Sequence, residues 1–167
     1  QRLAPGKKAL KNISLVNDVL GSGKNVMCVV INTDRIGNSG IHWFCLFVDM
    51  RPAGTENDPF TIEYFNSSGQ MARSEVTQWM HKAERELESA DNPNVPGTKY
   101  HAKRVTAATV QHQIDTDSEC GVYALYYIWR RLHGAPISEF SVRIPDQEMI
   151  NFRPKLFKNR NARGRKK

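Results

Sequence analysis

The sequence predicts an α+β fold in which a mixed β-sheet packs on a buried central helix. Residues 122–132 are apolar on nearly every face, and a helix that is apolar all round lies in a protein core. Three segments, 26–31, 41–48 and 60–65, are rich in β-branched and aromatic residues, which is typical of strands. Residues 71–90 carry apolar side chains at helical spacing and therefore predict an amphipathic helix.

The remaining elements follow in chain order. Residues 13–20 predict a short helix that is closed by glycines. Residues 100–105 and 109–114 predict two further strands. The central helix is expected to end just before Gly134, since glycine suits the position after a helix. Residues 145–152 predict a short terminal helix.

Length and composition indicate one globular domain, because 167 residues that are 40% hydrophobic can bury a sizeable core. We expect residues 1–24 to be a partly disordered segment with a short helix. Residues 25–157 would form the folded domain and residues 158–167 a basic tail. No run has the length of a membrane span and no signal-peptide pattern is present, so we expect no membrane contact. We also expect a monomer. Because the chain starts at Gln1, a fragment or processed form is expected.

The formal net charge is +7, and much of the excess lies near the C-terminal end. The candidate nucleic-acid-binding residues there are Arg160, Arg163, Arg165, Lys166 and Lys167. A basic tail of this kind is compatible with a solvated segment, with nucleic-acid binding or with nuclear import. Composition does not separate these three alternatives.

The chain has three cysteines, of which Cys28 and Cys45 fall inside predicted strands and are expected to be small buried core residues. The odd count and the absence of clustered spacing argue against a disulfide framework, and no metal-ligand motif is present. We therefore expect no metal and no cofactor. Free thiols suit a reducing, intracellular compartment.

The third cysteine, Cys120, lies where a polar loop meets the central helix. The unpaired N–H groups and the dipole at a helix N-terminus favour negative charge, which lowers the pKa of a thiol. This position therefore predicts a nucleophilic thiolate. Such a nucleophile requires a base within hydrogen-bond reach and a group that orients the base.

The candidate base is His42, which opens a strand after a glycine-containing loop, where catalytic groups are common. If residues 41–48 and 60–65 form a hairpin, His42 lies opposite Asn66, give or take one residue. Directly opposed side chains have Cβ atoms about 5 Å apart, so the asparagine carbonyl can accept from one imidazole nitrogen. The competing interpretation is that Asn66 merely begins a turn, since Asn and Ser favour turns. Because His42 lies opposite and the chain also has the candidate nucleophile Cys120, we favour the interpretation that Asn66 orients His42.

An oxyanion hole requires donors aimed at the developing charge. The backbone N–H of Cys120 is one candidate. Gln113 is a second candidate, on the segment that leads into the Cys120 loop, but Gln111 lies on the same face of a strand and competes with it. The spacing leaves both glutamines open, and either can also be an exposed strand residue.

The order of these motifs resembles the ubiquitin-like-protein (SUMO) protease and adenovirus protease group of cysteine peptidases, within the papain-like superfamily. The elements that carry the resemblance are His42-Trp43, then Tyr-Phe-Asn at 64–66, then Gln113, then Glu-Cys-Gly at 119–121. The resemblance runs from near residue 26 to residue 132. It implies that His42 is the base, Asn66 the orienting residue, Cys120 the nucleophile and Gln113 an oxyanion donor.

The resemblance also implies a narrow substrate channel beside Trp43 and Gly121 that admits glycine. Three departures from the cellular SUMO proteases point to large-DNA-virus maturation proteases. Asn66 replaces the usual acid, as in the polyprotein protease of African swine fever virus; Gln113 lies seven residues before Cys120; and the loop between the paired strands is long.

We therefore expect a cysteine endopeptidase that cleaves after glycine and processes viral structural polyproteins during virion maturation. Its place would be the host cytoplasm, the virion or the nucleus. One alternative is a deSUMOylase or deubiquitinase that cleaves isopeptide bonds. An alternative of another class is an inactive scaffold or nucleic-acid-binding protein with a protease fold.

Overall fold

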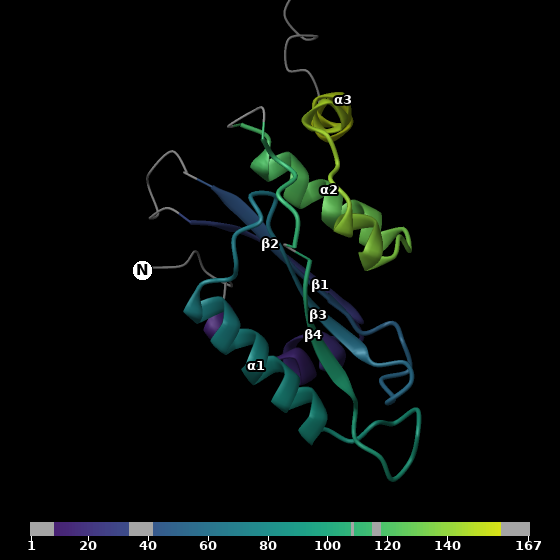
Figure 1. Cartoon of the computed structure of the whole chain (residues 1–167). Coiled ribbons are helices and arrows are strands. Elements are labelled where there is room, and N and C mark those ends of the chain that lie inside the picture. The colour runs from purple at the N-terminus through teal and green to yellow at the C-terminus, as the bar shows by residue number, and fades with distance from the viewer. Residues whose placement is uncertain (1–8, 34–41, 108, 115–117, 158–167) are drawn as a thin grey trace, which may run out of the picture.

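The computed structural model describes residues 9–33, 42–107, 109–114 and 118–157, which form an α+β fold around one four-stranded sheet (Figure 1). The predicted fold class is confirmed. In chain order the elements are the 3₁₀ turn η1 (Leu10–Asn12), the π turn η2 (Leu15–Val19), the 3₁₀ turn η3 (Leu20–Ser22), β1 (Val26–Asn32), β2 (Trp43–Asp49), β3 (Phe60–Phe65), α1 (Ser74–Ser89), β4 (Ala102–Thr106), α2 (Cys120–Leu132), the 3₁₀ turn η4 (Ile137–Ser141) and α3 (Asp146–Leu156).

The sheet is mixed, with strand order β1-β2-β3-β4. Strand β2 pairs with β1 and with β3 in antiparallel fashion, and β4 joins β3 in parallel after a connection that contains α1. In the β2–β3 pair, Cys45 lies opposite Phe65 and Leu46 opposite Tyr64, a register shifted by two residues from a direct pairing of His42 with Asn66. The start of β2 and the end of β3 therefore meet at one end of the sheet.

Helix α1 covers one face of the sheet, and α2 and α3 lie on the other (Figure 1). On the α1 face, Trp79 belongs to the same buried cluster as Leu46 of β2. On the opposite face, Tyr127 of α2 stacks on Phe65 with ring centroids 4.4 Å apart. Burying a large apolar side chain contributes about 1.5–3 kcal/mol. These contacts make α2 the buried central helix that the sequence predicts.

A buried ion pair fastens the C-terminal end of α2 to the sheet. The Glu63 side chain on β3 is fully buried, and it accepts hydrogen bonds from Arg131 Nε (2.9 Å) and from the Tyr127 hydroxyl (2.7 Å). Arg51 donates to the backbone carbonyls of Arg131 and Leu132, at 2.9 and 3.1 Å. Because an unpaired buried charge is very costly, each member of this pair requires the other.

One expected strand is absent from the described residues. Residues 109–114 form no strand; the backbone N–H groups of His112 and Gln113 both donate to the Ser67 carbonyl, which joins this segment to the turn after β3. The short helix expected at residues 13–20 is present as a π-helical turn followed by a 3₁₀ turn that ends at Gly23. Local propensity is weak in both segments, so tertiary hydrogen bonds decide their conformation.

The expectation that Cys28 is buried is also wrong, since its side chain is exposed while that of Cys45 is buried. Cys28 lies on β1, which is an edge strand, whereas Cys45 lies on the interior strand β2. An edge strand has a neighbour on one side only and is covered less well. The edge position cannot be read from the sequence of the strand itself.

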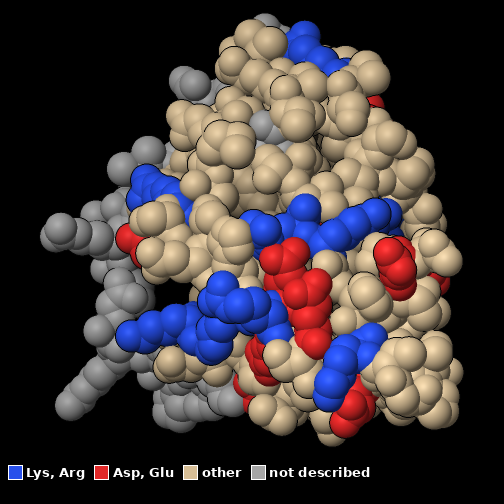
Figure 2. All heavy atoms as spheres, turned by 60° about the horizontal axis from the view of Figure 1, so that its bottom comes forward, with Lys and Arg blue, Asp and Glu red and all other residues tan. Residues whose placement is uncertain are grey.

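Charged side chains of both signs share the surface of the described residues. On the face seen in Figure 2, Lys and Arg lie among Asp and Glu, without one uninterrupted basic patch. Arg104 pairs with Glu84 and Lys99 with Asp91, each at 2.6 Å. The predicted basic tail, residues 158–167, lies outside the described residues. None of the helices in the described part has the length and apolar character needed to cross a bilayer.

Candidate active site

Cys120 is the first residue of α2, and only 6% of its surface is exposed. Three residues meet it at the end of the sheet: His42, Trp43 and Gly121. Burial raises the pKa of the Cys120 thiol, but the hydrogen bond with His42 and backbone hydrogen bonds with Trp43 and Gly121 outweigh it, so this pKa lies below its ordinary value. The surroundings of the thiol therefore favour the thiolate.

His42 lies just before β2, and its Nε2 is 2.6 Å from Asn66 Oδ1. Because the amide oxygen can only accept, Nε2 carries a proton, and Nδ1 is the ring nitrogen that can serve the thiol. The pKa of His42 is raised, first by the hydrogen bond with Cys120 and further by that with Asn66, although burial lowers it. A lowered thiol pKa beside a raised imidazole pKa is the direction expected of a thiolate–imidazolium pair.

The contact between His42 and Asn66 is slightly different from the one expected. The observed register extends to place Phe44, two residues further along, opposite Asn66. His42 and Phe44 share one face of the strand, since strand side chains alternate with period two. The His42 side chain therefore reaches Asn66 along a diagonal, a distance that long side chains span.

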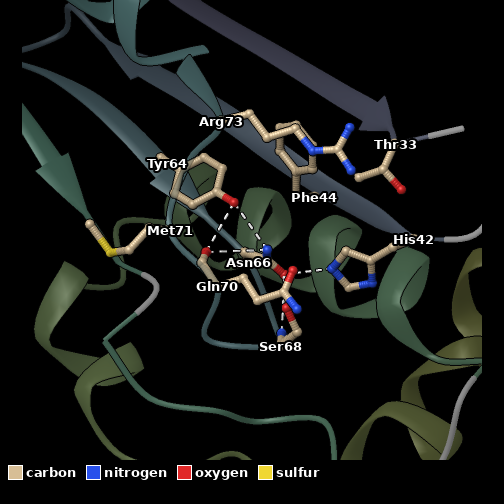
Figure 3. Close-up of a pocket in the computed structure, with 9 residues that line it drawn as sticks. All are labelled: Thr33, His42, Phe44, Tyr64, Asn66, Ser68, Gln70, Met71 and Arg73. Carbon is tan, nitrogen blue, oxygen red and sulfur yellow. Dashed lines mark hydrogen bonds between the residues drawn. The ribbon is translucent and has the colours of Figure 1, made fainter. Parts of the chain in front are cut away.

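Four hydrogen bonds determine the orientation of the Asn66 amide, which is 3% exposed (Figure 3). Its Nδ2 donates to the Tyr64 hydroxyl (3.0 Å) and to the Gln70 carbonyl (3.3 Å). Its Oδ1 accepts from the backbone N–H (3.1 Å) and the hydroxyl (2.9 Å) of Ser68. Because these partners distinguish the amide nitrogen from the amide oxygen, the oxygen is the atom that faces His42. Asn66 also begins a turn, as its carbonyl accepts from Gly69 N–H at 3.1 Å, so both sequence interpretations describe it.

The structure separates the two glutamine candidates. The Gln113 side chain is half-buried, and its Oε1 accepts from the Ser67 hydroxyl at 3.1 Å. Ser67 directly follows Asn66, so the turn after β3 orients both side chains. Gln111 is exposed, and its side-chain amide donates to the backbone carbonyl of Gln113 at 3.1 Å. This arrangement favours Gln113 over Gln111, and the role of Gln113 as an oxyanion donor stays a prediction.

Trp43 packs against the start of α2. A Cβ atom placed on Gly121 would lie 3.8 Å from Trp43 Cγ, so the indole is in van der Waals range of this glycine. The two residues line an apolar groove of about 410 Å³, together with Val122, Leu125 and others. The residues that the sequence assigns to substrate binding are therefore neighbours beside the thiol.

A contact that sequence reasoning missed holds the residue before the nucleophile. The carboxyl group of Glu119 is almost fully buried, and it bonds Arg153 of α3 at 2.8 Å. Arg153 also lines the groove with Trp43. The partner lies 34 residues away on another helix, and the sequence carries no signal for the pairing. The hydrogen bond between Asn66 and Tyr64 could have been predicted from the sequence, since side chains two residues apart along a strand share a face.

The other four histidines lie away from this contact. His112 is fully buried, and Ile144 N–H donates to its Nδ1 at 3.1 Å. His133 bonds the Trp129 carbonyl at the end of α2, which fits a helix-end residue. His101 is exposed, and His81 contacts Arg104 at 2.9 Å. Within the described residues, no group of three or more His, Cys, Asp or Glu could hold a metal ion.

A thiol at a helix N-terminus, an imidazole hydrogen-bonded to it and an amide that orients the imidazole define the class of site, that of a cysteine peptidase. The Ulp1 protease family, C-terminal catalytic domain, matches residues 22–167, and the chain therefore belongs to the Ulp1 protease family.

Comparison with individual proteins agrees with this family. The chain is 37% identical over 137 residues to the SUMO-1 cysteine protease of African swine fever virus, an overlap of 80% of this chain and 44% of that protein. A protein of Acanthamoeba polyphaga mimivirus is 25% identical over 152 residues, 87% of this chain and 43% of that protein. A crystal structure of the African swine fever virus pS273R protease superimposes with a TM-score of 0.73 at 30% identity, covering 89% of this chain and 54% of that one. The chain thus spans about half the length of the relatives it matches.

Proposed function

We propose that this chain is a cysteine endopeptidase that hydrolyses peptide bonds after glycine, in Gly-Gly-X or Gly-X-Gly-X sequences. The observation that carries the proposal is the contact of His42 with both Cys120 and Asn66 at the N-terminus of α2. Cys120 is the nucleophile, His42 the general base and acid, and Asn66 the residue that orients the imidazole. Gln113 and the backbone N–H of Cys120 are the oxyanion donors.

The reaction proceeds in two steps. The Cys120 thiolate attacks the carbonyl carbon, and the oxyanion that forms accepts hydrogen bonds from the two donors. As the C–N bond breaks, the His42 imidazolium gives its proton to the leaving amine, and a thioester remains. His42 then takes a proton from water, which attacks the thioester and releases the carboxylate product together with the Cys120 thiolate. The protonated nitrogen of His42 that faces Asn66 keeps its proton throughout.

The packing of Trp43 against Gly121 supports the preference for glycine. A bulky indole beside the thiol narrows the approach, and a residue without Cβ allows a chain to pass closely. We expect alanine in place of the glycine before the scissile bond to lower kcat/KM sharply, and leucine there to leave almost no cleavage. Trp43→Ala should relax this preference. Equal rates for glycine and leucine peptides would contradict the channel.

A viral structural polyprotein is the proposed physiological substrate. Support comes from the similarity to a protease of African swine fever virus. A thiolate nucleophile suits a reducing environment, so we place the reaction in the host cytoplasm or the virion.

Cleavage of a ubiquitin-like protein is a second candidate, because the family is that of Ulp1 and a relative is named a SUMO-1 cysteine protease. The chemistry at Cys120 is the same for both substrates. The two differ in the leaving group, which is a backbone amine in a polyprotein and a lysine side-chain amine in a SUMO conjugate.

The discriminating experiment offers the purified chain two substrates with the same Gly-Gly acyl side, one with a linear peptide bond to a folded reporter and one with an isopeptide bond from SUMO. Preferential cleavage of the linear bond supports the polyprotein proposal, and preferential cleavage of the conjugate supports the second candidate. Cys120→Ser is the matched control and should cleave neither. If neither substrate is cleaved and a Gly-Gly vinyl sulfone does not label Cys120, the chain is an inactive scaffold and the proposal is wrong.

The basic tail is a separate proposal, resting on the net charge of +7. Deletion of residues 160–167 should leave peptide cleavage unchanged and reduce the salt dependence of binding to a mixed-sequence duplex. An unchanged salt slope would contradict nucleic-acid binding by Arg160, Arg163, Arg165, Lys166 and Lys167.

A further inference from the structure

A polar hollow of about 330 Å³ lies beside the contact between His42 and Asn66 (Figure 3). Its described lining presents hydroxyl, amide and imidazole groups and one permanent cation, the guanidinium of Arg73, and it includes no Asp or Glu. We call this hollow the Arg73 pocket. It shares part of its wall with the proposed general base.

The backbone of Arg73 is well anchored. This residue directly precedes α1, and its carbonyl accepts from the N–H groups of Val76 and Thr77, each at 3.0 Å. Its side chain extends toward Thr33, which also lines the pocket (Figure 3). A positively charged side chain therefore runs from the start of α1 toward the end of β1 along the wall of the pocket.

Arg73 differs from most of the other arginines that the structure describes, although Arg85 also has no ion pair in this part of the chain. The guanidinium groups of Arg51, Arg104, Arg130 and Arg131 each contact a carboxylate. In the described part of the chain, no such ion pair involves Arg73. An arginine fork matches the geometry of a carboxylate, so the Arg73 pocket is suited to an acidic group.

The charge of Arg73 acts inside the pocket. The pKa of Tyr64 is raised by burial, while the hydrogen bond with Asn66 and the charge of Arg73 lower it. The pKa of His42 is raised chiefly by its hydrogen bond with Cys120, and the charge of Arg73 opposes this increase. A bound carboxylate would thus meet a positive potential next to the imidazole.

The two hollows lie near different members of the proposed catalytic set. The apolar groove includes Trp43 and Gly121, which flank Cys120, whereas His42 lines the Arg73 pocket. In the proposed reaction the leaving amine receives its proton from His42, so the residues that follow it in the substrate must pass the imidazole. The groove then suits the acyl side, and the Arg73 pocket suits the leaving-group side.

We propose that the Arg73 pocket receives the substrate residues that follow the scissile bond, and that Arg73 selects an acidic side chain among the first three of them. This inference rests on the proposed endopeptidase function and adds a specificity-determining residue to it. Arg73 acts on the choice of substrate and takes no part in bond making or breaking. Three residues of an extended chain span about 10 Å, and these first three positions after the cut are the ones tested.

The test uses fluorogenic peptides with a fixed Gly-Gly acyl side, in which Glu, Gln or Lys occupies each of the first three positions after the cut. For the wild-type chain, we expect Glu to exceed Gln in kcat/KM by about threefold to fivefold at one of these positions, as for a solvent-accessible ion pair, and Lys to be the poorest. Added salt should reduce the difference. Arg73→Gln should abolish it, and Arg73→Glu should favour Lys.

Arg85→Gln is the matched control, since Arg85 is exposed on α1, about 18 Å from Arg73 along the helix axis. It removes the same charge and should leave the ratio of Glu to Gln rates unchanged. Equal rates for Glu, Gln and Lys at all three positions would overturn the role of Arg73 while leaving the endopeptidase function intact. A selectivity that Arg85→Gln reduces as much as Arg73→Gln would show a general charge effect and would also overturn it. Failure to cleave any peptide would overturn the proposed function itself.

Discussion

The two ends of helix α2 carry polar groups for opposite purposes. At its C-terminal end, Arg131 and Glu63 form a buried ion pair in which each group has several partners. At its N-terminal end, the Cys120 thiol is buried among groups that lower its pKa. This difference indicates that the position of the Cys120 thiol depends on contacts at the other end of α2 and along its packed face. The anchored end and the packed aromatic face fix the helix, so the other end can keep a thiol whose charged form reacts.

The largest expected effect comes from breaking the reactive end. Cys120→Ser replaces sulfur by oxygen with little change in size, so we expect kcat/KM for a Gly-Gly peptide to fall at least a thousandfold, roughly the loss typical of removing a nucleophile. The melting temperature should stay close to that of the wild type, which differential scanning calorimetry can check. Cleavage at the wild-type rate would remove Cys120 from the mechanism.

Removing the ion pair at the C-terminal end of α2 should mainly lower the stability of the fold. Glu63→Ala leaves Arg131 as a buried charge without its carboxylate, and the loss of one partner of a buried pair costs about 3–5 kcal/mol of unfolding free energy. Urea denaturation measures this loss. The double variant Glu63→Leu with Arg131→Met should recover part of it, since no charge is left uncompensated. A single variant as stable as the wild type would show that the pair does not anchor α2.

Substitutions of Asn66 test how much the activity depends on the orientation of the His42 imidazole. Asn66→Leu removes the acceptor for His42, and we expect kcat/KM to fall about a hundredfold, within the range of general acid–base catalysis. Asn66→Asp keeps an acceptor and should retain substantial activity. Its added negative charge should also raise the pKa of His42 further. If the leucine variant were as active as the wild type, Asn66 would be a turn residue and nothing more.

The smallest expected effect is a shift along the pH axis. Because the pKa of Cys120 is lowered by the hydrogen bond with His42 against the effect of burial, the rate of thiol alkylation should rise with pH through a midpoint below the ordinary thiol value. In His42→Ala the burial effect remains and the opposing hydrogen bond is lost, so the midpoint should move to higher pH. The rate of iodoacetamide labelling of Cys120, measured from pH 5 to 10, checks this direction. Identical profiles for both proteins would contradict the thiol–imidazole pair.

Periodicity and turn residues predicted most of the elements. Strands β1, β2 and β3 and helices α1 and α2 lie close to their expected ranges. The segment 109–114 could not be predicted, because its backbone donors go to the Ser67 carbonyl in a turn some forty residues earlier. The exposure of Cys28 depends on which strand forms the edge of the sheet, a property of topology.

By itself, the sequence determined which side chains are available for chemistry and how they follow one another: a cysteine at a helix start, a histidine before a strand and an asparagine after its partner strand. These features depend on local periodicity, capping and hairpin register, and all are short-range. Only the tertiary structure joined Gln113 to the turn after β3 and left Gln111 exposed, paired Glu119 with Arg153 and brought Arg73 to the wall of a pocket beside His42. These contacts join residues that lie far apart in the chain, and side-chain pairing at such separations depends on how the layers pack.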